Sequence, residues 1–254
     1  MKYMTKNLTL AAAITLAMAS LGAGLAHAED APAAEAKPDH EYSFNAALTS
    51  DYRYRGISQS RLKPAIQAGA DYTHNPTGLY VGTWASSIKW IDDAGGDVNV
   101  EWDIYGGKRG DIGGGVTYDV GLLYYYYPSN GLHPDANTGE VYGALAYGPV
   151  SVKYSSAMTN LFGFADSKYS GYTDVSLNQD VYDGYILNAH VGRQTVRHNS
   201  DFTYTDWKVG FTKDYGIVTV ALAAVKANTH AYLSPRNGKN LAKTGAVLTV
   251  SKTF

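Results

Sequence analysis

Four basic residues, Arg53, Arg55, Arg61 and Lys63, are crowded into one short stretch of this sequence. The guanidinium group of arginine is planar and binds carboxylates and phosphates through paired hydrogen bonds, so the stretch has the chemistry of an anion-binding site. Asp51 offers a carboxylate close by in the sequence. The cluster therefore either binds an anionic partner or pairs internally with acidic residues, and internal pairing is the interpretation that we favour.

A second segment has the residue types of a hydrolytic site. His198, Asn199 and Ser200 have the His-x-Ser spacing, with a nearby Asn, that some phospholipases use. Arg197 and Asp201 flank the segment, which falls in a predicted loop. Three-residue matches arise often by chance, and nothing singles out an Asp–His pair elsewhere. We therefore predict no catalytic residues and no enzyme activity.

Metal and cofactor sites have little support in the sequence. Cysteine is absent, which excludes disulfides and Cys-ligated zinc. The seven histidines show no H-E-x-x-H spacing. The acidic segment 90–97 offers the oxygen ligands that calcium prefers, but a solvated loop is the simpler interpretation. We expect neither a metal nor a cofactor.

Composition narrows the class of protein. A net charge of −2 over 254 residues argues against a basic nucleic-acid-binding protein. The aromatic content of 13% argues against disorder. The 22 tyrosines, against 6 phenylalanines and 4 tryptophans, favour β-structure whose rings lie at a polar boundary. The slightly negative mean hydropathy argues against a bundle of membrane helices.

The first residues have the pattern of a secretory signal peptide, which we place at residues 1–28. Lys2 and Lys6 supply a basic start, an apolar stretch follows, and Ala26-His27-Ala28 is an A-x-A cleavage site. An uncleaved membrane anchor is the alternative, but no stop-transfer flank is present. Residues 29–40 are rich in Ala and Pro and are predicted to form a flexible periplasmic leader.

The rest of the chain shows the period-two alternation of β-strands. Ile66, Ala68 and Ala70, for example, alternate with Gln67, Gly69 and Asp71. No later apolar run reaches the ~18 residues of a membrane helix. We predict twelve strands, at 41–52, 64–74, 79–89, 97–107, 114–127, 140–148, 150–157, 168–179, 184–193, 202–214, 217–227 and 245–254.

The connections between these strands alternate strictly between short and long. The short ones are 75–78, 108–113, 148–149, 180–183 and 214–216, and the long ones are 53–63, 90–96, 128–139, 157–167, 194–201 and 228–244. Such sorting is typical of a transmembrane barrel with periplasmic turns and longer outer loops. A closed barrel also pairs every backbone polar group inside hydrocarbon. The sequence thus predicts an all-β, antiparallel up-and-down transmembrane barrel of about twelve strands over residues 41–254.

Tyrosines cluster at the end of one predicted strand. Tyr124 to Tyr127 precede Pro128, and aromatic girdles mark both edges of membrane barrels. We predict that this run belongs to the outer girdle. The competing interpretation is a tyrosine-rich groove that binds a ligand.

Polar residues that alternate with the apolar ones should face the lumen. The inward set is predicted to be Gln67, Asp71, Asn99, Glu101, Asp103, Tyr105, Asp119, Lys153, Asn188, His190, Asp206 and Lys208. Rings of charge set ion preference in pores, and the acids slightly outnumber the bases, so a mild cation preference is expected. Alternatively, these charges pair across strands and fill the barrel.

The first long connection adds its arginines to this set. Its cations would screen solutes if the loop folds inward, contact lipopolysaccharide phosphates if it faces outward, or pair with Asp51 and lumen acids. The candidates for lining the lumen and selecting solutes are Arg53, Arg55, Asp71, Glu101, Asp103, Asp119, Lys153, Asp206 and Lys208.

Several segments resemble one known family. Residues 50–59, SDYRYRGISQ, resemble the opening signature of the TorF porin family, also called Gcw_chp. The similarity continues at 64–69, 78–86, 101–107, 118–128, 206–210 and 251–254, and so covers nearly all of the chain after residue 28. The resemblance implies an outer-membrane barrel and a channel, without a settled substrate. The terminal Phe254 also resembles the end that outer-membrane proteins present to the barrel-assembly machinery.

The expected function is passive diffusion of small hydrophilic solutes or ions across a bacterial outer membrane. Barrels of about eight strands are filled by side chains and those of about sixteen to eighteen are open, so we expect a narrow or partly plugged pore. The alternative is a closed barrel with a structural role or with ligand binding by its outer loops. Expected partners are outer-membrane lipid and lipopolysaccharide, the assembly machinery through Phe254, and the solutes, but no nucleic acid.

Overall fold

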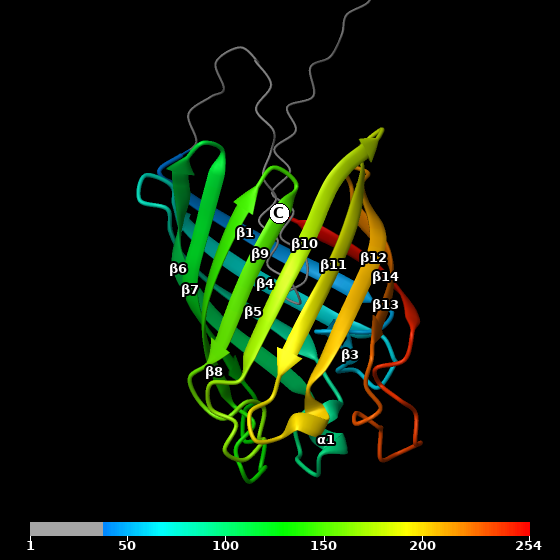
Figure 1. Cartoon of the computed structure of the whole chain (residues 1–254). Helices are drawn as coiled ribbons and strands as arrows, with labels where there is room; N and C mark the ends of the chain where they lie inside the picture. The colour runs from blue at the N-terminus through cyan, green and yellow to red at the C-terminus, as the bar shows by residue number, and fades with distance from the viewer. Residues whose placement is uncertain (1–37) are drawn as a thin grey trace, which may run out of the picture.

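Twelve long strands form a closed antiparallel barrel in the computed structural model, which describes residues 38–254 (Figure 1). They are β1 (His40–Thr49), β4 (Ala65–His74), β5 (Leu79–Ser87), β6 (Val100–Gly113), β7 (Val116–Tyr126), β8 (Thr138–Tyr147), β9 (Val150–Ala157), β10 (Gly171–Tyr182), β11 (Tyr185–Thr195), β12 (Tyr204–Asp214), β13 (Thr219–Ala227) and β14 (Gly245–Thr253). Each pairs with its neighbours along the chain, and β1 pairs with both β4 and β14. The predicted fold is confirmed. The signal peptide expected at 1–28 and most of the leader expected at 29–40 lie outside the described residues.

Alternation of side chains gives the barrel an apolar outside. On β1, Tyr42, Phe44 and Leu48 point outward and are 66%, 57% and 57% exposed. The intervening Ser43 and Asn45 are partly covered on the inner face. Because closure leaves no strand edge unpaired, the backbone polar groups of the wall are satisfied within the sheet. None of the helices in residues 38–254 is long and apolar enough to cross a membrane.

Long and short connections segregate to opposite ends, as expected. The short turns, at 75–78, 114–115, 148–149, 183–184 and 215–218, define what we call the turn end. The long connections, at 50–64, 88–99, 127–137, 158–170, 196–203 and 228–244, define the loop end. The first residue of β1 and the last residue of β14 both lie at the turn end. The loop end holds the remaining short elements: β2 (Arg53–Tyr54), β3 (Ile57–Ser58), α1 (Trp90–Asp93) and the 3-10 turn η1 (Ser200–Phe202).

Several strand boundaries differ from the sequence prediction. The first strand ends at Thr49 rather than at residue 52, and β6 continues through the predicted turn at 108–113, so that its turn lies at 114–115. The turn after β10 lies at Asp183-Gly184 rather than at 180–183, and both residues have positive φ, 46° and 71°. That conformation is the type I′ hairpin turn, which glycine favours. In addition, β6 begins at Val100 instead of residue 97. Val98 is buried and Asn99 is exposed, bonded to Lys89, so the prediction that Asn99 faces the lumen is wrong.

The tyrosine run is divided between the two faces of the wall. Tyr124 is exposed on the outer face, and Tyr126 shares that face. Tyr125 and Tyr127 turn inward and are only 3% and 1% exposed. The prediction that all four tyrosines belong to the outer girdle is therefore wrong for the inner pair. Strict alternation along β7 is the reason.

Candidate channel interior

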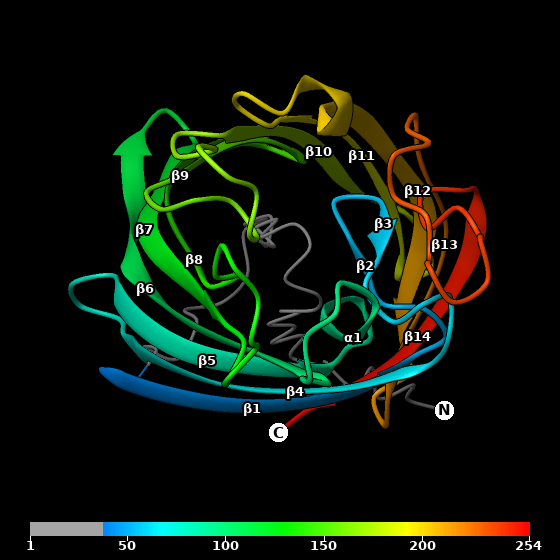
Figure 2. The same cartoon turned by 90° about the horizontal axis from the view of Figure 1, so that it is seen from below.

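Residues 50–64, hereafter the inner loop, fold from the end of β1 into the barrel. Seen from the loop end, β2 and β3 lie within the ring of strands, as does α1 (Figure 2). The two short strands form a hairpin whose turn is Arg55-Gly56, with φ of 45° and 79°. A Cβ on Gly56 would lie 2.6 Å from the Cβ of Asp206 on β12. Only glycine therefore allows the hairpin tip to lie this close to the wall.

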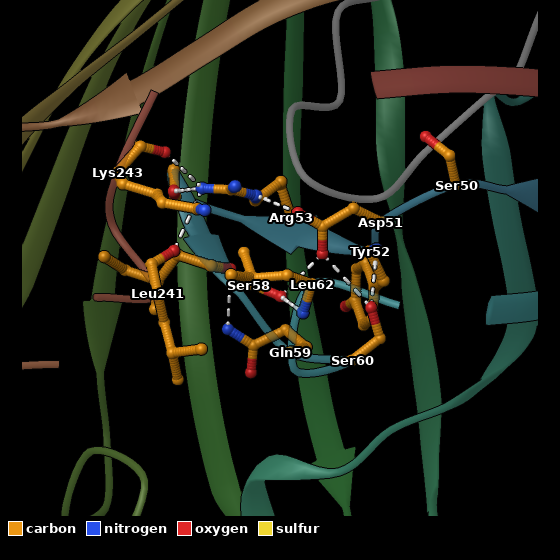
Figure 3. A network of polar contacts seen from close by, with 12 residues as sticks. Ser50, Asp51, Tyr52, Arg53, Ser58, Gln59, Ser60, Leu62, Leu241 and Lys243 are labelled. Carbon is orange, nitrogen blue, oxygen red and sulfur yellow. Dashed lines mark hydrogen bonds and ion pairs between the residues drawn. The ribbon is translucent and has the colours of Figure 1, made fainter. Parts of the chain in front are cut away.

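Arg53 and Asp51 hold the inner loop together (Figure 3). The Nε of Arg53 donates to Asp51 at 2.5 Å, and the other carboxylate oxygen of Asp51 accepts from Ser58 at 2.6 Å. The Nη1 of Arg53 donates to the carbonyl oxygens of Leu241 and Lys243, at 2.9 and 3.1 Å. Both partners belong to the connection that precedes β14. The pair thus orders the inner loop and fastens it to the last connection of the chain.

Arg55 anchors the hairpin to the opposite part of the wall. Its Nη2 donates to Glu140 on β8 at 2.7 Å, and its Nη1 donates to Gln194 on β11 at 2.7 Å. Its guanidinium carbon lies 4.7 Å from the ring centroid of Tyr54 and 4.3 Å from that of Tyr172. Burial disfavours the charged form, but Glu140 and the tyrosines outweigh it and raise the pKa of Arg55. The hairpin is therefore held by a buried, charged side chain.

A third anchor reaches the strands on another side. The hydroxyl of Tyr52 donates to Glu101 on β6 at 2.5 Å, and the ring of Tyr52 packs edge-on against Trp84 on β5 with centroids 5.4 Å apart. Tyr127 donates to the second oxygen of Glu101 at 2.8 Å. With these contacts, the inner loop touches the wall on β5, β6, β8, β11 and β12. It crosses the lumen close to the loop end.

The inner surface of the wall becomes progressively more buried toward the inner loop. On β11, Asn188 near the turn end is half-buried, whereas His190 and Gln194 are 9% and 3% exposed. On β7, Asp119 is half-buried and Tyr125 is buried. β10 shows the same gradient, from the partly buried Asn178 to the buried Asp174, whereas Thr73 on β4 and Ala146 on β8 are buried near the turn end. The lumen is accessible from the turn end and narrows where the inner loop crosses it.

Most lumen candidates have polar or aromatic neighbours. Near the loop end, His190 lies between Asp174 and Asp206, with N–O distances of 2.5 and 3.0 Å. Glu101, Asp103 and Asp206 are almost fully buried. Neither carboxylate oxygen of Asp103 has a hydrogen-bond partner among the described residues.

Closer to the turn end the candidates are partly exposed. Asp71 accepts from Tyr105 at 2.5 Å and Asp119 from Tyr80 at 2.6 Å. The Nζ of Lys153 lies 3.9 Å from the ring centroid of Tyr142. Lys208 is partly buried on the inner face of β12. Arg53 pairs with Asp51, and Asp206 pairs with His190. Asp71 and Asp119 accept hydrogen bonds from tyrosines instead and belong to neither pair. Selection of solutes by these residues stays a prediction.

Arg61 separates from the other arginines and joins three loops at the outer surface. It contacts Asp92 and Asp93 at 2.8 and 2.6 Å, and Arg236 reaches Asp92 at 3.0 Å. The hydrogen bond from Arg61 lowers the pKa of Asp92. Two carboxylates of the acidic segment 90–97, those of Asp92 and Asp93, therefore form ion pairs with arginines. Lys63 is exposed.

The His-x-Ser segment does not assemble a catalytic pair. The Nδ1 of His198 lies 2.8 Å from the carbonyl oxygen of Asp166, on an exposed loop. Ser200 begins η1, and no hydrogen bond joins it to His198 in residues 38–254. No group of three His, Asp or Glu side chains in the described part of the chain is arranged to hold a metal ion.

Sequence reasoning missed several residues that position the inner loop, namely Tyr52, Glu140, Tyr172 and Gln194. Glu140 was the first residue of a predicted strand, where alternation does not fix the face. Alternation places Tyr52 in the first predicted strand, 41–52, but that strand ends at Thr49. The only available signal was the unpaired charge of the arginine cluster, which requires buried acceptors if the loop turns inward.

Together, the fold and the inward loop define a porin-like β-barrel. The chain belongs to the Gcw_chp family, described as bacterial proteins of unknown function, whose model matches residues 33–254. That description assigns no role, so the channel implied by the TorF resemblance stays a prediction. Among curated proteins, none matches this chain in sequence.

Solved structures resemble the barrel in shape rather than in sequence. The KdgM porin matches with a TM-score of 0.54 at 6% identity, over 84% of this chain and 98% of its own. The KdgM porin in complex with disordered oligogalacturonate matches with a TM-score of 0.53 at 5% identity, over 84% and 97%. OccK5 (OpdH) of Pseudomonas aeruginosa covers 85% of this chain and 67% of its own, with a TM-score of 0.42 at 11% identity. At these identities the likeness to KdgM concerns the fold alone.

Proposed function

We propose that this protein is a channel of the bacterial outer membrane through which small hydrophilic solutes and ions diffuse passively. The observation that carries the proposal is a closed barrel with a polar interior and with an inner loop that crosses the lumen near the loop end, where α1 also lies within the ring of strands. A filled barrel would need no gradient of burial along its wall. The KdgM porin, which has a similar fold, forms a complex with disordered oligogalacturonate, which supports a solute path through such a barrel.

We propose that the apolar outer face contacts the membrane and that the long connections face outward, as they do in bacterial outer-membrane barrels. Strands with exposed Leu, Val and aromatic side chains suit the hydrocarbon layer. The loop end then faces the cell exterior and the lipopolysaccharide, and the turn end faces the periplasm. Phe254 is 70% exposed at the end of the chain, where the barrel-assembly machinery could contact it.

The charge distribution suggests a mild preference for cations. Acids outnumber bases among the inward-facing residues as a whole, although in the accessible part of the lumen Asp71 and Asp119 lie together with the cations Lys153, Lys208 and Arg109. Because rings of charge bias the ions that enter a pore, these carboxylates would attract cations from the periplasmic side.

Single-channel recording tests the proposal. The protein, extracted in detergent from the membranes of a bacterial expression host, is reconstituted into a planar bilayer under a salt gradient. We expect discrete conductance steps and a reversal potential that favours cations. Silence from a barrel shown to be folded by its mobility shift on unheated gels would contradict the channel. It would support a closed barrel that binds ligands through its outer loops.

A further inference from the structure

A cavity of about 390 Å3 lies at the loop end, between the inner loop and the outer loops. Its rim includes the exposed residues Ala94 and His133, and its floor includes the buried residues Tyr125, Tyr127 and Gln194. A volume within the roughly 300–1,000 Å3 range of small-molecule sites suits one small ring compound. The cavity therefore lies where a solute arriving from outside would first meet the barrel.

Aromatic rings form much of the wall. Phe162, from the connection between β9 and β10, packs edge-on against Tyr54, Tyr125 and Trp90 with centroids 5.6, 5.1 and 6.3 Å apart. It has a φ of 45°, which bulky residues rarely adopt, and its backbone N–H donates to Thr138 at 2.8 Å. The loop thus presents this ring to the cavity in a strained conformation. Aromatic rings associate with one another through such edge and offset contacts.

The cavity wall offers an anion few cationic partners. Among the described residues that line it, none is Lys or Arg. The carboxylate of Glu101 is the acidic group in the lining, and its two oxygens accept from Tyr52 and Tyr127. The Arg55 guanidinium behind Tyr54 and Gln194 is already paired with Glu140. His133 on the rim is the one basic side chain among the described lining residues, so a carboxylate ligand would find no lysine or unpaired arginine here. The indole N–H of Trp90 has no partner in the described structure, so a donor remains for an uncharged acceptor.

We infer that this cavity binds uncharged aromatic or heteroaromatic ring compounds. Aromatic and aliphatic side chains form most of the lining, and small-molecule sites of this make-up, with a few polar groups, favour planar apolar rings. The inference names a solute class for the channel proposed above, and in that sense rests on it. Binding itself requires only the folded loops, so binding and conduction are measured separately.

Ligand-observed NMR on the full-length, detergent-extracted protein tests the solute class with three probes. Nicotinamide is an uncharged heteroaromatic ring, nicotinate has the same ring with a carboxylate, and glucose is a non-aromatic ring. We expect nicotinamide to bind at least about fivefold more tightly than nicotinate and glucose to give no signal. Equal binding of nicotinate, or preferential binding of glucose, would overturn the inference.

Two substitutions locate the binding. Phe162→Leu keeps an apolar side chain but removes the ring, and should weaken nicotinamide binding about three- to tenfold. Phe211→Leu makes the same change on the outer face of β12, where Phe211 is 50% exposed, and should leave binding unchanged. Equal effects of the two variants would refute the site.

A variant that gains affinity for a ligand excludes misfolding as the reason for a change in binding. Ala94 is exposed on the rim after α1, so Ala94→Lys adds a cation without disturbing the core. This variant should raise the affinity for nicotinate relative to nicotinamide, and an unchanged ratio would count against the cavity. Binding without conductance would keep the site and reject the channel, whereas conductance without binding would reject the site alone.

Discussion

The two halves of the barrel interior are built from the same strands but behave differently. Toward the turn end, inward residues such as Asp119 and Asn188 are partly exposed. Toward the loop end, inward residues such as Asp103 and Gln194 are almost completely covered. The wall itself does not change, since every strand alternates throughout. The difference coincides with the inner loop and with the segments packed against it, such as α1, which lies within the same ring of strands. The width of the proposed pore would therefore depend on these loops as well as on strand number.

The charges of the two halves also do different things. Near the loop end, buried pairs such as Arg55–Glu140 hold elements in place. A buried pair stabilises little by itself, but losing one partner is costly. Near the turn end, carboxylates such as Asp119 remain accessible to ions. The charges that hold elements in place and the charges that we propose to act on passing ions therefore lie in different halves of the barrel.

The largest effect should come from removing the inner loop. Replacing residues 51–63 by a short Gly-Ser linker should raise single-channel conductance several-fold, because the loop end would become as accessible as the turn end. The barrel should still form, since its strands pair with one another and not with the loop. Unchanged conductance in a folded barrel would show that the narrowing lies elsewhere.

Next in size is the loss of one anchor. Glu140→Ala leaves the Arg55 guanidinium without its carboxylate and should weaken docking of the inner loop by about 3–5 kcal/mol. Trypsin should then cleave at the arginines of the loop, which gel analysis detects. The double variant Arg55→Met/Glu140→Leu removes both charges and should restore resistance. Cleavage of the double variant at the same rate would mean that apolar packing cannot replace this anchor.

Neutralising an acid should have different consequences in the two halves. Asp119→Asn, in the accessible half, should lower the cation-to-anion permeability ratio up to about twofold, as expected for a unit charge at roughly 10 Å in water. Asp103→Asn, in the buried half, should leave the ratio unchanged and raise the urea midpoint, because an unpaired buried carboxylate is lost. Reversal potentials and urea titrations measure the two effects. A change in the cation-to-anion permeability ratio of Asp103→Asn would contradict the proposed difference between the two halves.

The smallest effect concerns the outer contacts of Arg61. Since Arg61 lowers the pKa of Asp92, its contribution is present above the ordinary Asp pKa of about 3.9 and is lost as pH falls through the lower folded value. The urea midpoints of the parent protein and Asp92→Asn should therefore differ slightly at pH 7 and converge as the pH falls below the lowered pKa of Asp92. A difference that persists at low pH would assign the effect to packing of α1.

Alternation predicted the wall from sequence because each strand must present one face to an apolar layer and the other to the lumen. It failed where that constraint ends. Val98 precedes β6 and packs under α1, so an apolar residue there did not mark an outward face. Alternation also cannot predict the inner loop, because β2 and β3 are each only two residues long. Internal pairing of the arginine cluster was anticipated, and Arg53–Asp51 shows it, but Glu140 as the partner of Arg55 depends on which strands lie across the lumen.

The attachment of Arg53 to the carbonyl groups of Leu241 and Lys243 has a consequence for the order of assembly. Arg53 follows the first strand, and its partners directly precede the last. β1 pairs with β4 along residues 40–49 but with β14 only along 45–49, so the seam between first and last strands is the shortest contact of β1. The inner loop acquires its final fastening only when that seam closes. Before β14 joins the sheet, the inner loop would lack this fastening and the proposed pore would stay wide. Narrowing of the proposed pore would therefore mark the completed barrel.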